Sequence, residues 1–312
     1  MLSVADFSYQ LPANLIAHQP TKKRTSARLL VFYRQTGKWS HHYFSQLPSL
    51  LEKTGKKYLL IYNDSRVIPA RLYAQKLTGG KVELLLSKSH QQTTQTQIWE
   101  CLCKPGLKPH TTLQLAAGLK AQVLSRVSPN SYEHLIQFPL NQRRFYQYLN
   151  QYGHTPIPPY IKTNLAEVKL RRVYQTIYAR HQGSVAAPTA GLHFSQALWQ
   201  QLIKAGHTLM PVTLHVGLGT FLGVKTNNLA NHRLHREYFH VSARTLAAIE
   251  KAHNTKQPIL AIGTTSTRVL ESLQKKDWLQ KQDLVRETQI FLYPPAKFHH
   301  TQHLITNFHL QR

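Results

Sequence analysis

The sequence predicts an α/β fold, in which an open, barrel-like α/β main domain carries an inserted small all-β barrel domain. Two observations predict it. In the second half of the chain, short apolar segments end in loops rich in Gly, Thr and Ser, and helical patterns follow, as over residues 184–216 and 259–273. Between residues 70 and 138, six short alternating segments follow one another with turn signals between them, which is typical of a small barrel or sandwich.

The first elements come from the N-terminal part of the chain. Residues 28–34 and 38–44 read as a hairpin around Gly37, a short helix begins near Pro48, and residues 58–62 form a buried strand.

The β segment follows. Its expected strands cover residues 70–77, 81–87, 97–104, 111–116, 119–127 and 132–138. Glycine and proline turn signals separate them. Near Asn141 the helical period returns, and Gly153 ends that helix. We therefore expect residues 68–140 to form the inserted barrel and residues 1–67 and 141–312 to form the α/β domain.

Three loops in the second half have the character of ligand loops. A short strand over residues 184–187 leads into the loop 187–194, and a helix capped by Ser195 leads to a strand over residues 209–216 and the loop 213–221. A buried strand at 259–262 ends in Gly263 and three hydroxyl residues, before a helix over 268–273. Open α/β sheets bind ligands at such strand ends, and helix N-termini suit carboxylate or phosphate. Tight turns, ordinary capping and structural roles for His193 and His215 explain the same residues.

Charge points to the kind of partner. The chain has 39 Lys and Arg against 13 Asp and Glu, a formal net charge of +26. Such a field favours a polyanion, with nucleic acid preferred to an anionic membrane surface because no basic amphipathic helix stands out. Tyrosines interleave with several basic pairs and could stack on unpaired bases, which favours RNA, since the usual DNA-binding motifs are absent. Each basic pair by itself could equally be a solvated face.

Cysteine usage and hydropathy bear on the compartment. The only two cysteines, Cys101 and Cys103, fall on one face of a strand, which is an awkward arrangement for a disulfide. No leader or membrane-length segment is evident, and no Cys/His spacing fits a metal site. We expect a cytoplasmic protein without a metal.

Nine ordered segments carry a family resemblance. Besides residues 186–194 and 212–221, they are Asp6-Phe-Ser-Tyr-Gln-Leu-Pro12, Asn63-Asp-Ser-Arg-Val-Ile-Pro-Ala-Arg71, Thr78-Gly-Gly-Lys-Val-Glu83, Tyr174-Gln-Thr-Ile-Tyr178, His235-Arg-Glu-Tyr238, residues 263–272 and Thr306-Asn-Phe-His309. With them the chain resembles the S-adenosylmethionine:tRNA ribosyltransferase-isomerases of queuosine biosynthesis over essentially its whole length.

The resemblance implies an activity. The family transfers and isomerises the ribosyl moiety of S-adenosylmethionine onto 7-aminomethyl-7-deazaguanine at the tRNA wobble position, giving epoxyqueuosine, adenine and methionine. S-adenosylmethionine is then a consumed substrate, with no cofactor. The partners implied are this tRNA and S-adenosylmethionine, with a monomer that needs no protein partner.

Site residues follow from the same segments. For S-adenosylmethionine we expect the methionine carboxylate at the loop after residue 262 and the nucleoside between the other two loops; the candidates are Thr189, Gly191, His193, Gly217, Gly219, Thr220, Gly263, Thr264, Thr265, Ser266, Arg268, Asn307 and His309. For tRNA the candidates are Asp64, Arg66, Arg71 and Lys76, of which the three cations could equally tether the two domains.

The implied chemistry needs acid–base groups, because a proton beside the sulfonium must be removed and the departing adenine must be protonated. Acidic residues are scarce, and Glu237 with His235 or His215 forms our candidate set. The alternative is that Glu237 pairs structurally with Arg71 or Arg268.

One departure from the family pattern bears on activity. After Leu310 the family continues with an apolar stretch, whereas this sequence ends at Arg312. Such a shortened C-terminus is expected to expose apolar surface or remove a wall of the site. A second hypothesis follows, in which the chain is a catalytically impaired homologue that acts as a basic tRNA- or RNA-binding protein.

Overall fold

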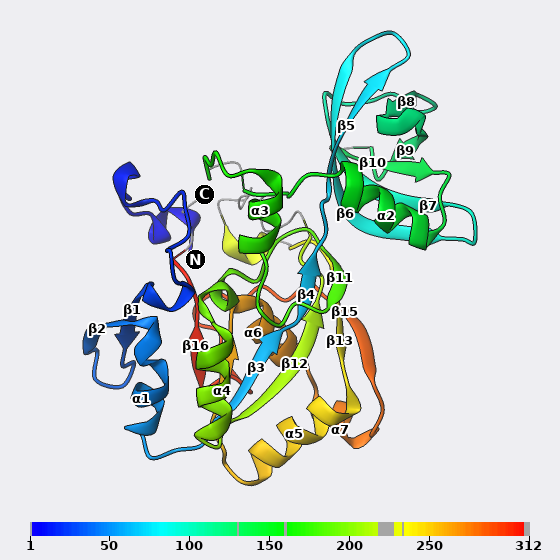
Figure 1. Cartoon of the computed structure of the whole chain (residues 1–312). Coiled ribbons are helices and arrows are strands. Elements are labelled where there is room, and N and C mark those ends of the chain that lie inside the picture. Colours follow the sequence, from blue (N-terminus) through cyan, green and yellow to red (C-terminus); the bar gives the residue numbers. More distant parts are fainter. Residues whose placement is uncertain (1, 130, 159–160, 218–227, 233, 309–312) are drawn as a thin grey trace.

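The structure is a computed structural model of the chain and describes residues 2–129, 131–158, 161–217, 228–232 and 234–308. It contains a six-stranded open sheet, a closed six-stranded barrel and two two-stranded sheets (Figure 1). The predicted fold class, an open α/β part with a small β-barrel, is confirmed.

The open sheet has the strand order β15-β13-β12-β3-β14-β16. Its strands are β3 (Leu59–Asn63), β12 (Thr208–Leu214), β13 (Glu237–Val241), β14 (Ile259–Ile262), β15 (Leu284–Thr288) and β16 (His303–Ile305). The four strands β12, β3, β14 and β16 run parallel, while β13 and β15 are antiparallel additions at one edge.

Helices cover both faces of this sheet. On one face, α5 (Ala243–Asn254), α6 (Thr264–Glu271) and α7 (Lys275–Leu279) pack on Leu59 and Ile61 of the central strand. On the other face, α1 (Leu47–Glu52) and α4 (Gln196–Lys204) pack around Leu60. Because alternate residues of a strand face opposite sides, a central strand between two helical layers is apolar throughout, which is what the sequence showed at this strand.

The barrel contains the strands β5 (Arg71–Lys76), β6 (Lys81–Gln92), β7 (Gln97–Lys104), β8 (Thr112–Leu115), β9 (Lys120–Arg126) and β10 (Glu133–Phe138). All six lie within two residues of their predicted starts, because each alternates buried and exposed residues between turns. Inside, Trp99 stacks on Phe145 of α2 (Gln142–Tyr152). Cys101 and Cys103 are both buried on the interior face and free, as expected. The domain boundaries at residues 68 and 140 stay a prediction.

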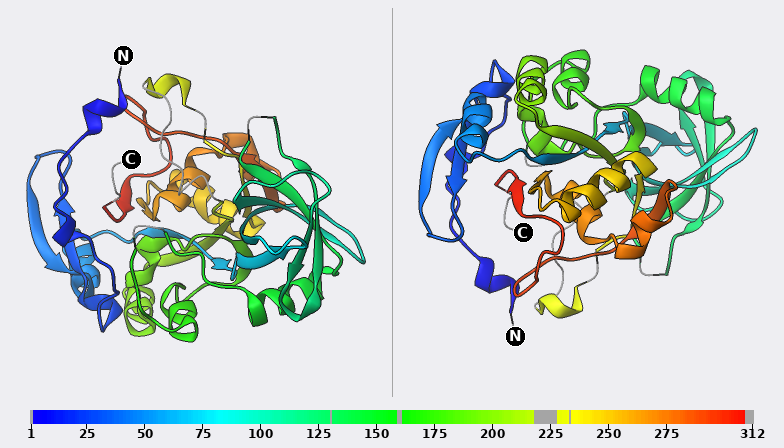
Figure 2. Two further views of the ribbon diagram at one scale, coloured as in Figure 1. Left: turned by 90° about the horizontal axis from the view of Figure 1, so that it is seen from above. Right: turned by 90° about the horizontal axis from the view of Figure 1, so that it is seen from below.

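The N-terminal hairpin is also where the sequence predicts it, with β1 (Arg28–Phe32) and β2 (Trp39–Tyr43). Figure 2 shows this hairpin and the barrel at opposite ends of the molecule.

Two predicted elements differ from the structure. The strand expected at residues 184–187 is β11 (His181–Ser184), and it pairs in parallel with β4 (Ser65–Val67) outside the open sheet. The helix expected at residues 268–273 is α6, which begins four residues earlier, at Thr264. A further helix, α3 (Glu167–Val173), lies before β11.

Candidate functional site

The predicted ligand loops follow the carboxyl ends of the parallel strands. Asp64 follows β3, residues 215–217 follow β12, Gly263 follows β14, and Thr306 and Asn307 follow β16. Because these four strands are parallel, their carboxyl ends meet at one edge of the open sheet. This edge is the position at which α/β folds bind ligands.

A short helical turn, η6 (Thr189–His193), lies against this edge. A Cβ added at Gly263 would lie 3.8 Å from the Ala190 Cβ, and the His193 Nε2 lies 3.3 Å from the Asn307 Oδ1. Burial lowers the pKa of His193 and so favours the neutral imidazole. The structure therefore brings together the predicted segments 189–193, 263–266 and 307.

The position of Gly191 in this turn leaves no room for a side chain. An added Cβ would overlap the Tyr178 hydroxyl and lie 2.8 Å from the Thr176 Cγ2. The hydroxyls of Tyr178 and Thr176 are buried and have no hydrogen-bond partner within the described part of the chain. Burial also raises the pKa of Tyr178, so this phenol stays neutral. A polar group of a ligand could form the hydrogen bonds that these two buried hydroxyls lack within the described residues.

The start of α6 offers backbone N–H groups. Gly263 has a φ of +89°, which glycine adopts without strain, and the helix begins at the next residue. The Ser266 hydroxyl donates its proton to the Ile262 carbonyl at 2.8 Å, which leaves the backbone N–H of this first-turn residue for a ligand. Thr264 is exposed, and the Thr265 Oγ1 is buried with no partner among the described residues.

Glu237 sits at the start of β13 with 5% exposure. Its Oε1 accepts from the Gly217 N–H at 3.2 Å, and its Oε2 forms an ion pair with the Arg268 guanidinium. Burial lowers the pKa of Arg268 to about 10, which still leaves it charged at neutral pH. This is one of the two structural pairings that the sequence left open; Arg71 instead pairs with Glu83 at 3.0 Å.

A second polar cluster surrounds Asp64, which is 5% exposed. Its Oδ1 accepts from the Thr213 hydroxyl at 2.6 Å, and its Oδ2 lies 3.6 Å from the His181 Nε2. Burial raises the pKa of Asp64, against the lowering effects of Thr213 and His181. The buried side chain of Asn63 fixes this turn, because its Oδ1 accepts from the Ser65 and Leu214 N–H groups.

His215 lies next to this cluster. A Cβ added at Gly183 would be 2.9 Å from its imidazole, and its Nδ1 is buried without a partner in the described residues. Burial, and then the charge of His181, lower the pKa of His215 to about 4. At neutral pH it is therefore an uncharged imidazole that can accept a proton.

Strand pairing separates the predicted catalytic residues. The β12–β13 register places Leu214 opposite Phe239, and the His215 N–H donates to the Tyr238 carbonyl. Cross-strand partners share a face, so His215 lies on the face of Tyr238, while Glu237 lies on the face of Phe239, toward α6. The structure thus joins Glu237 to Arg268 on one face and His215 to the Asp64 cluster on the other. His235 is exposed, two residues before β13.

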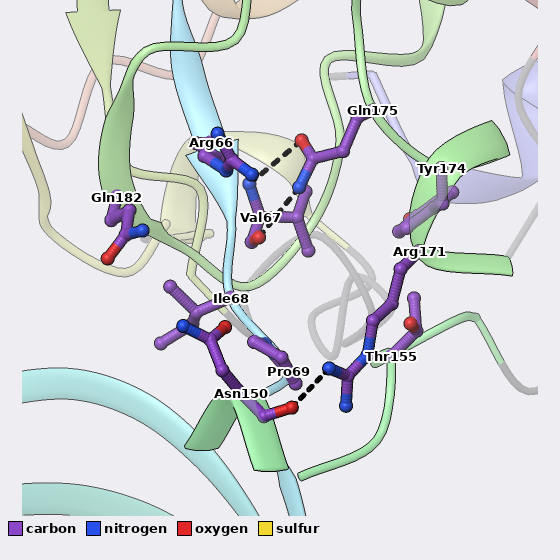
Figure 3. A pocket seen from close by; sticks show the side chains of 10 residues that line it. All are labelled: Arg66, Val67, Ile68, Pro69, Asn150, Thr155, Arg171, Tyr174, Gln175 and Gln182. Carbon is purple, nitrogen blue, oxygen red and sulfur yellow. Dashed lines mark hydrogen bonds between the residues drawn. The ribbon is translucent and has the colours of Figure 1, made fainter. Parts of the chain in front are cut away.

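The predicted tRNA cations lie near the passage between the sheet and the barrel. Arg66 and Arg171 line a small cavity of about 80 Å³ there (Figure 3). Gln175 fixes its wall through two hydrogen bonds with the Val67 backbone, at 3.1 and 2.7 Å. Arg171 is held by Glu167 at 2.8 Å, whereas Arg66 is exposed.

Other predicted residues differ in exposure or lie outside the described part. Lys76 is partly exposed on β5, whereas Asp64 is buried and so unlike the other tRNA candidates. Gly219, Thr220 and His309 lie outside the described residues.

Sequence reasoning assigned no role to Thr176, Tyr178 or His181. The first two lie in a segment that carried the resemblance, so that signal could have marked them. His181 had no such signal, because only the fold places it beside Asp64.

The described residues show neither a metal cluster nor a membrane-spanning helix. They contain no group of three or more His, Cys, Asp or Glu side chains that could hold a metal ion. None of their helices is long and apolar enough to cross a bilayer.

Comparison with known proteins gives concordant matches. Residues 4–312 match the family described as queuosine biosynthesis protein. The S-adenosylmethionine:tRNA ribosyltransferase-isomerase of Thermotoga petrophila is 40% identical over 314 residues, covering 100% of this chain and 88% of the relative. The enzyme of the same name from Carboxydothermus hydrogenoformans is 41% identical with the same coverage. A crystal structure of the S-adenosylmethionine tRNA ribosyltransferase from Thermotoga maritima is 29% identical, with a TM-score of 0.49, over 98% of this chain and 85% of that one.

Proposed function

We propose that this chain, which belongs to the family of queuosine biosynthesis proteins, acts as an S-adenosylmethionine:tRNA ribosyltransferase-isomerase. It transfers and isomerises the ribosyl moiety of S-adenosylmethionine onto 7-aminomethyl-7-deazaguanine at the tRNA wobble position, and releases adenine and methionine. One observation carries this proposal: relatives of that name match the whole chain at 40 to 41% identity. The second hypothesis, an impaired RNA-binding homologue, is not favoured by these matches.

The edge formed by the parallel strands is the proposed site for S-adenosylmethionine. The backbone N–H groups after Gly263 suit the methionine carboxylate, because they carry the partial positive charge of a helix start. The turn η6 and Gly217 would line the nucleoside, while Gly219 and Thr220, predicted for the same role, lie outside the described residues. The hydroxyls of Tyr178 and Thr176, which have no partner in the described part of the chain, support this placement, since a ligand group would satisfy them.

Proton transfer is assigned to the candidate set of Glu237, His235 and His215, and the geometry supports a different proposed role for each. His215 is assigned to proton acceptance because its imidazole is neutral at pH 7 and its Nδ1 has no partner among the described residues. Its pKa of about 4 lies below the operating pH, so bound substrate would have to raise this pKa for efficient base catalysis. Glu237 is held by Arg268 as a carboxylate, which suits it to orient the loop at Gly217 and to balance cationic charge. His235 is exposed, where a closing tRNA could bring it to the departing adenine.

The proposed tRNA surface is the passage between the sheet and the barrel. Arg66 is an exposed cation there. Arg71 and Lys76 are assigned to the same surface from β5, although Arg71 pairs with Glu83 and Lys76 lies on the opposite face of the strand. Asp64 contributes from inside, by fixing the turn that presents Arg66. The wobble base lies in a loop where bases are partly unstacked, so extruding it costs little.

The remaining parts of the proposal concern cofactors and surroundings. S-adenosylmethionine is consumed and no further cofactor takes part. The protein works as a monomer in the cytoplasm, where its tRNA substrate is.

Transfer of label tests the proposed function. The purified chain is incubated with S-adenosylmethionine labelled in the ribose and with tRNA that carries the aminomethyl base. The proposal expects the label in the tRNA. The controls are the same tRNA with an unmodified guanine and S-adenosylmethionine labelled in the methyl group, neither of which should label it. Tight binding of tRNA without transfer would support the RNA-binding hypothesis.

A further inference from the structure

The barrel has an open mouth that the proposed reaction does not use. A cavity of about 530 Å³ lies there, lined by residues of β7, β9, β10 and their loops, among them Cys103, Arg126, Ser131, Tyr132 and His134. This volume lies within the range of small-molecule sites. The barrel strands that line it are separate from the open sheet (Figure 1), at whose carboxyl edge the proposed S-adenosylmethionine site lies.

A buried histidine lines this cavity with one nitrogen unsatisfied. His134 is 1% exposed, and its Nε2 lies 2.9 Å from the Leu107 carbonyl. A carbonyl only accepts, so the proton of the neutral imidazole sits on Nε2 and leaves Nδ1 as an acceptor. That Nδ1 has no partner within the described part of the chain. A buried acceptor without a donor costs stability, so it marks a place for a ligand N–H or O–H group.

A β-bulge turns a cation into the same cavity. Along β9, Ala121 and Val123 face the interior, so simple alternation would put Arg126 outside. The pairing with β10 shifts at this point: Val123 pairs with Ile136, whereas Arg126 pairs with His134. The extra residue of the bulge therefore brings Arg126 onto the face of His134, which is a known use of bulges.

The charges around the mouth favour an anion. Residues 68–140 contain eight Lys and Arg against three Glu. One of these, Glu133, directly precedes His134 on β10 and so points to the opposite face. The Arg126 guanidinium donates a 3.4 Å hydrogen bond to the Pro129 carbonyl.

An aromatic side chain completes the set. Tyr132 lines the cavity and is 74% exposed, so its ring is accessible for stacking. A cation for phosphate, an acceptor for a base N–H or a ribose hydroxyl, and an aromatic ring for a base together match a nucleotide.

We propose that the mouth of the barrel binds an unpaired nucleotide of the substrate tRNA, away from the wobble base. This inference rests on the proposed function, because tRNA is the nucleic acid that this function brings to the protein. The barrel then provides a second binding site for the tRNA while the wobble base enters the site at the edge of the open sheet.

Binding of tRNA to full-length variants tests the proposal. We expect Arg126→Ala and Tyr132→Ala each to weaken tRNA binding about tenfold. Arg126→Ala should also reduce the slope of log affinity against log salt by about one, as for one lost phosphate contact. Both side chains are exposed, so neither change threatens the fold.

Two controls match these variants. Lys120→Ala removes the same charge from the same strand, but before the bulge and on the outer face. Tyr132→Phe keeps the ring. We expect both to bind tRNA like the wild type. Equal losses for Lys120→Ala and Arg126→Ala, or unchanged affinity of both alanine variants, would overturn the proposal. So would binding of free 5′-mononucleotides at the mouth while the alanine variants keep wild-type affinity for tRNA.

Ribosyl transfer by the wild type, measured in parallel, separates this proposal from the proposed function. If the wild type transfers ribose and the alanine variants bind tRNA normally, only the nucleotide site fails. If the wild type binds tRNA without transfer, the proposed function fails while the affinity comparison still decides the site.

Discussion

His215 should make the stability of this protein depend on pH in a defined window. Its pKa is about 4 in the folded protein and about 6.5 in the unfolded chain. At 1.36 kcal/mol per pKa unit, this difference corresponds to about 3 kcal/mol in the free energy of unfolding. Between these values the unfolded chain binds a proton that the folded chain does not. The contribution of His215 is therefore complete above pH 6.5 and is lost as the pH falls toward 4.

Urea unfolding of the wild type and of His215→Gln, from pH 7.5 to pH 4, measures this contribution. We expect the free energy of unfolding of the wild type to fall by about 3 kcal/mol more than that of the variant. Other titrating groups act in both proteins and cancel in the comparison. The exposed His41 provides the control, since His41→Gln should follow the wild type. A difference below about 0.5 kcal/mol between the two curves would refute the argument that burial holds this imidazole neutral.

Four further predictions concern Glu237, Gly191 and the net charge of the chain. Glu237→Gln leaves Arg268 buried without its partner and should lower the free energy of unfolding by about 3 kcal/mol in urea titrations, whereas adding Arg268→Met should restore most of it. If Glu237 also takes part in proton transfer, its glutamine variant should lose ~10²-fold or more in turnover, and near-normal turnover of the folded variant would exclude that role. Gly191→Ala should lower the free energy of unfolding by about 2 kcal/mol, because its Cβ would meet the Tyr178 hydroxyl. Adding Tyr178→Phe should recover part of this loss. Wild-type stability of Gly191→Ala would contradict the crowding. Binding of tRNA should weaken ~10³-fold or more between 50 and 200 mM salt, as measured by filter binding, if the net charge of +26 serves phosphate contacts; a flat response would contradict it.

Alternation of side chains made most of the fold readable from the sequence. The barrel strands β5 to β10 and the hairpin β1–β2 each bury one face, so period-two patterns and turn residues located them. The pairing of β11 with β4 was not readable, because a strand of four residues carries too little pattern to choose a partner. The early start of α6 was missed because Thr264 to Ser266 favour caps and loops by propensity, and Ser266 satisfies its hydroxyl inside the helix instead.

The site was predicted as a set of segments but not as a geometry. Loops at the carboxyl ends of parallel strands were expected to meet, and the structure joins residues 189–193, 263 and 307. Which side chains share a face depends on strand register, which a single sequence does not give. This is why Glu237 and His215 were grouped together, and why the pairing of Asp64 with His181 was not foreseen.

Release of adenine tests the central claim most directly. The purified chain is mixed with S-adenosylmethionine and tRNA carrying 7-aminomethyl-7-deazaguanine, and free adenine and methionine are measured. The proposed ribosyl transfer predicts both products in equal amounts, and neither with tRNA that has guanine at the wobble position. Saturating binding of the modified tRNA with no adenine released would contradict it.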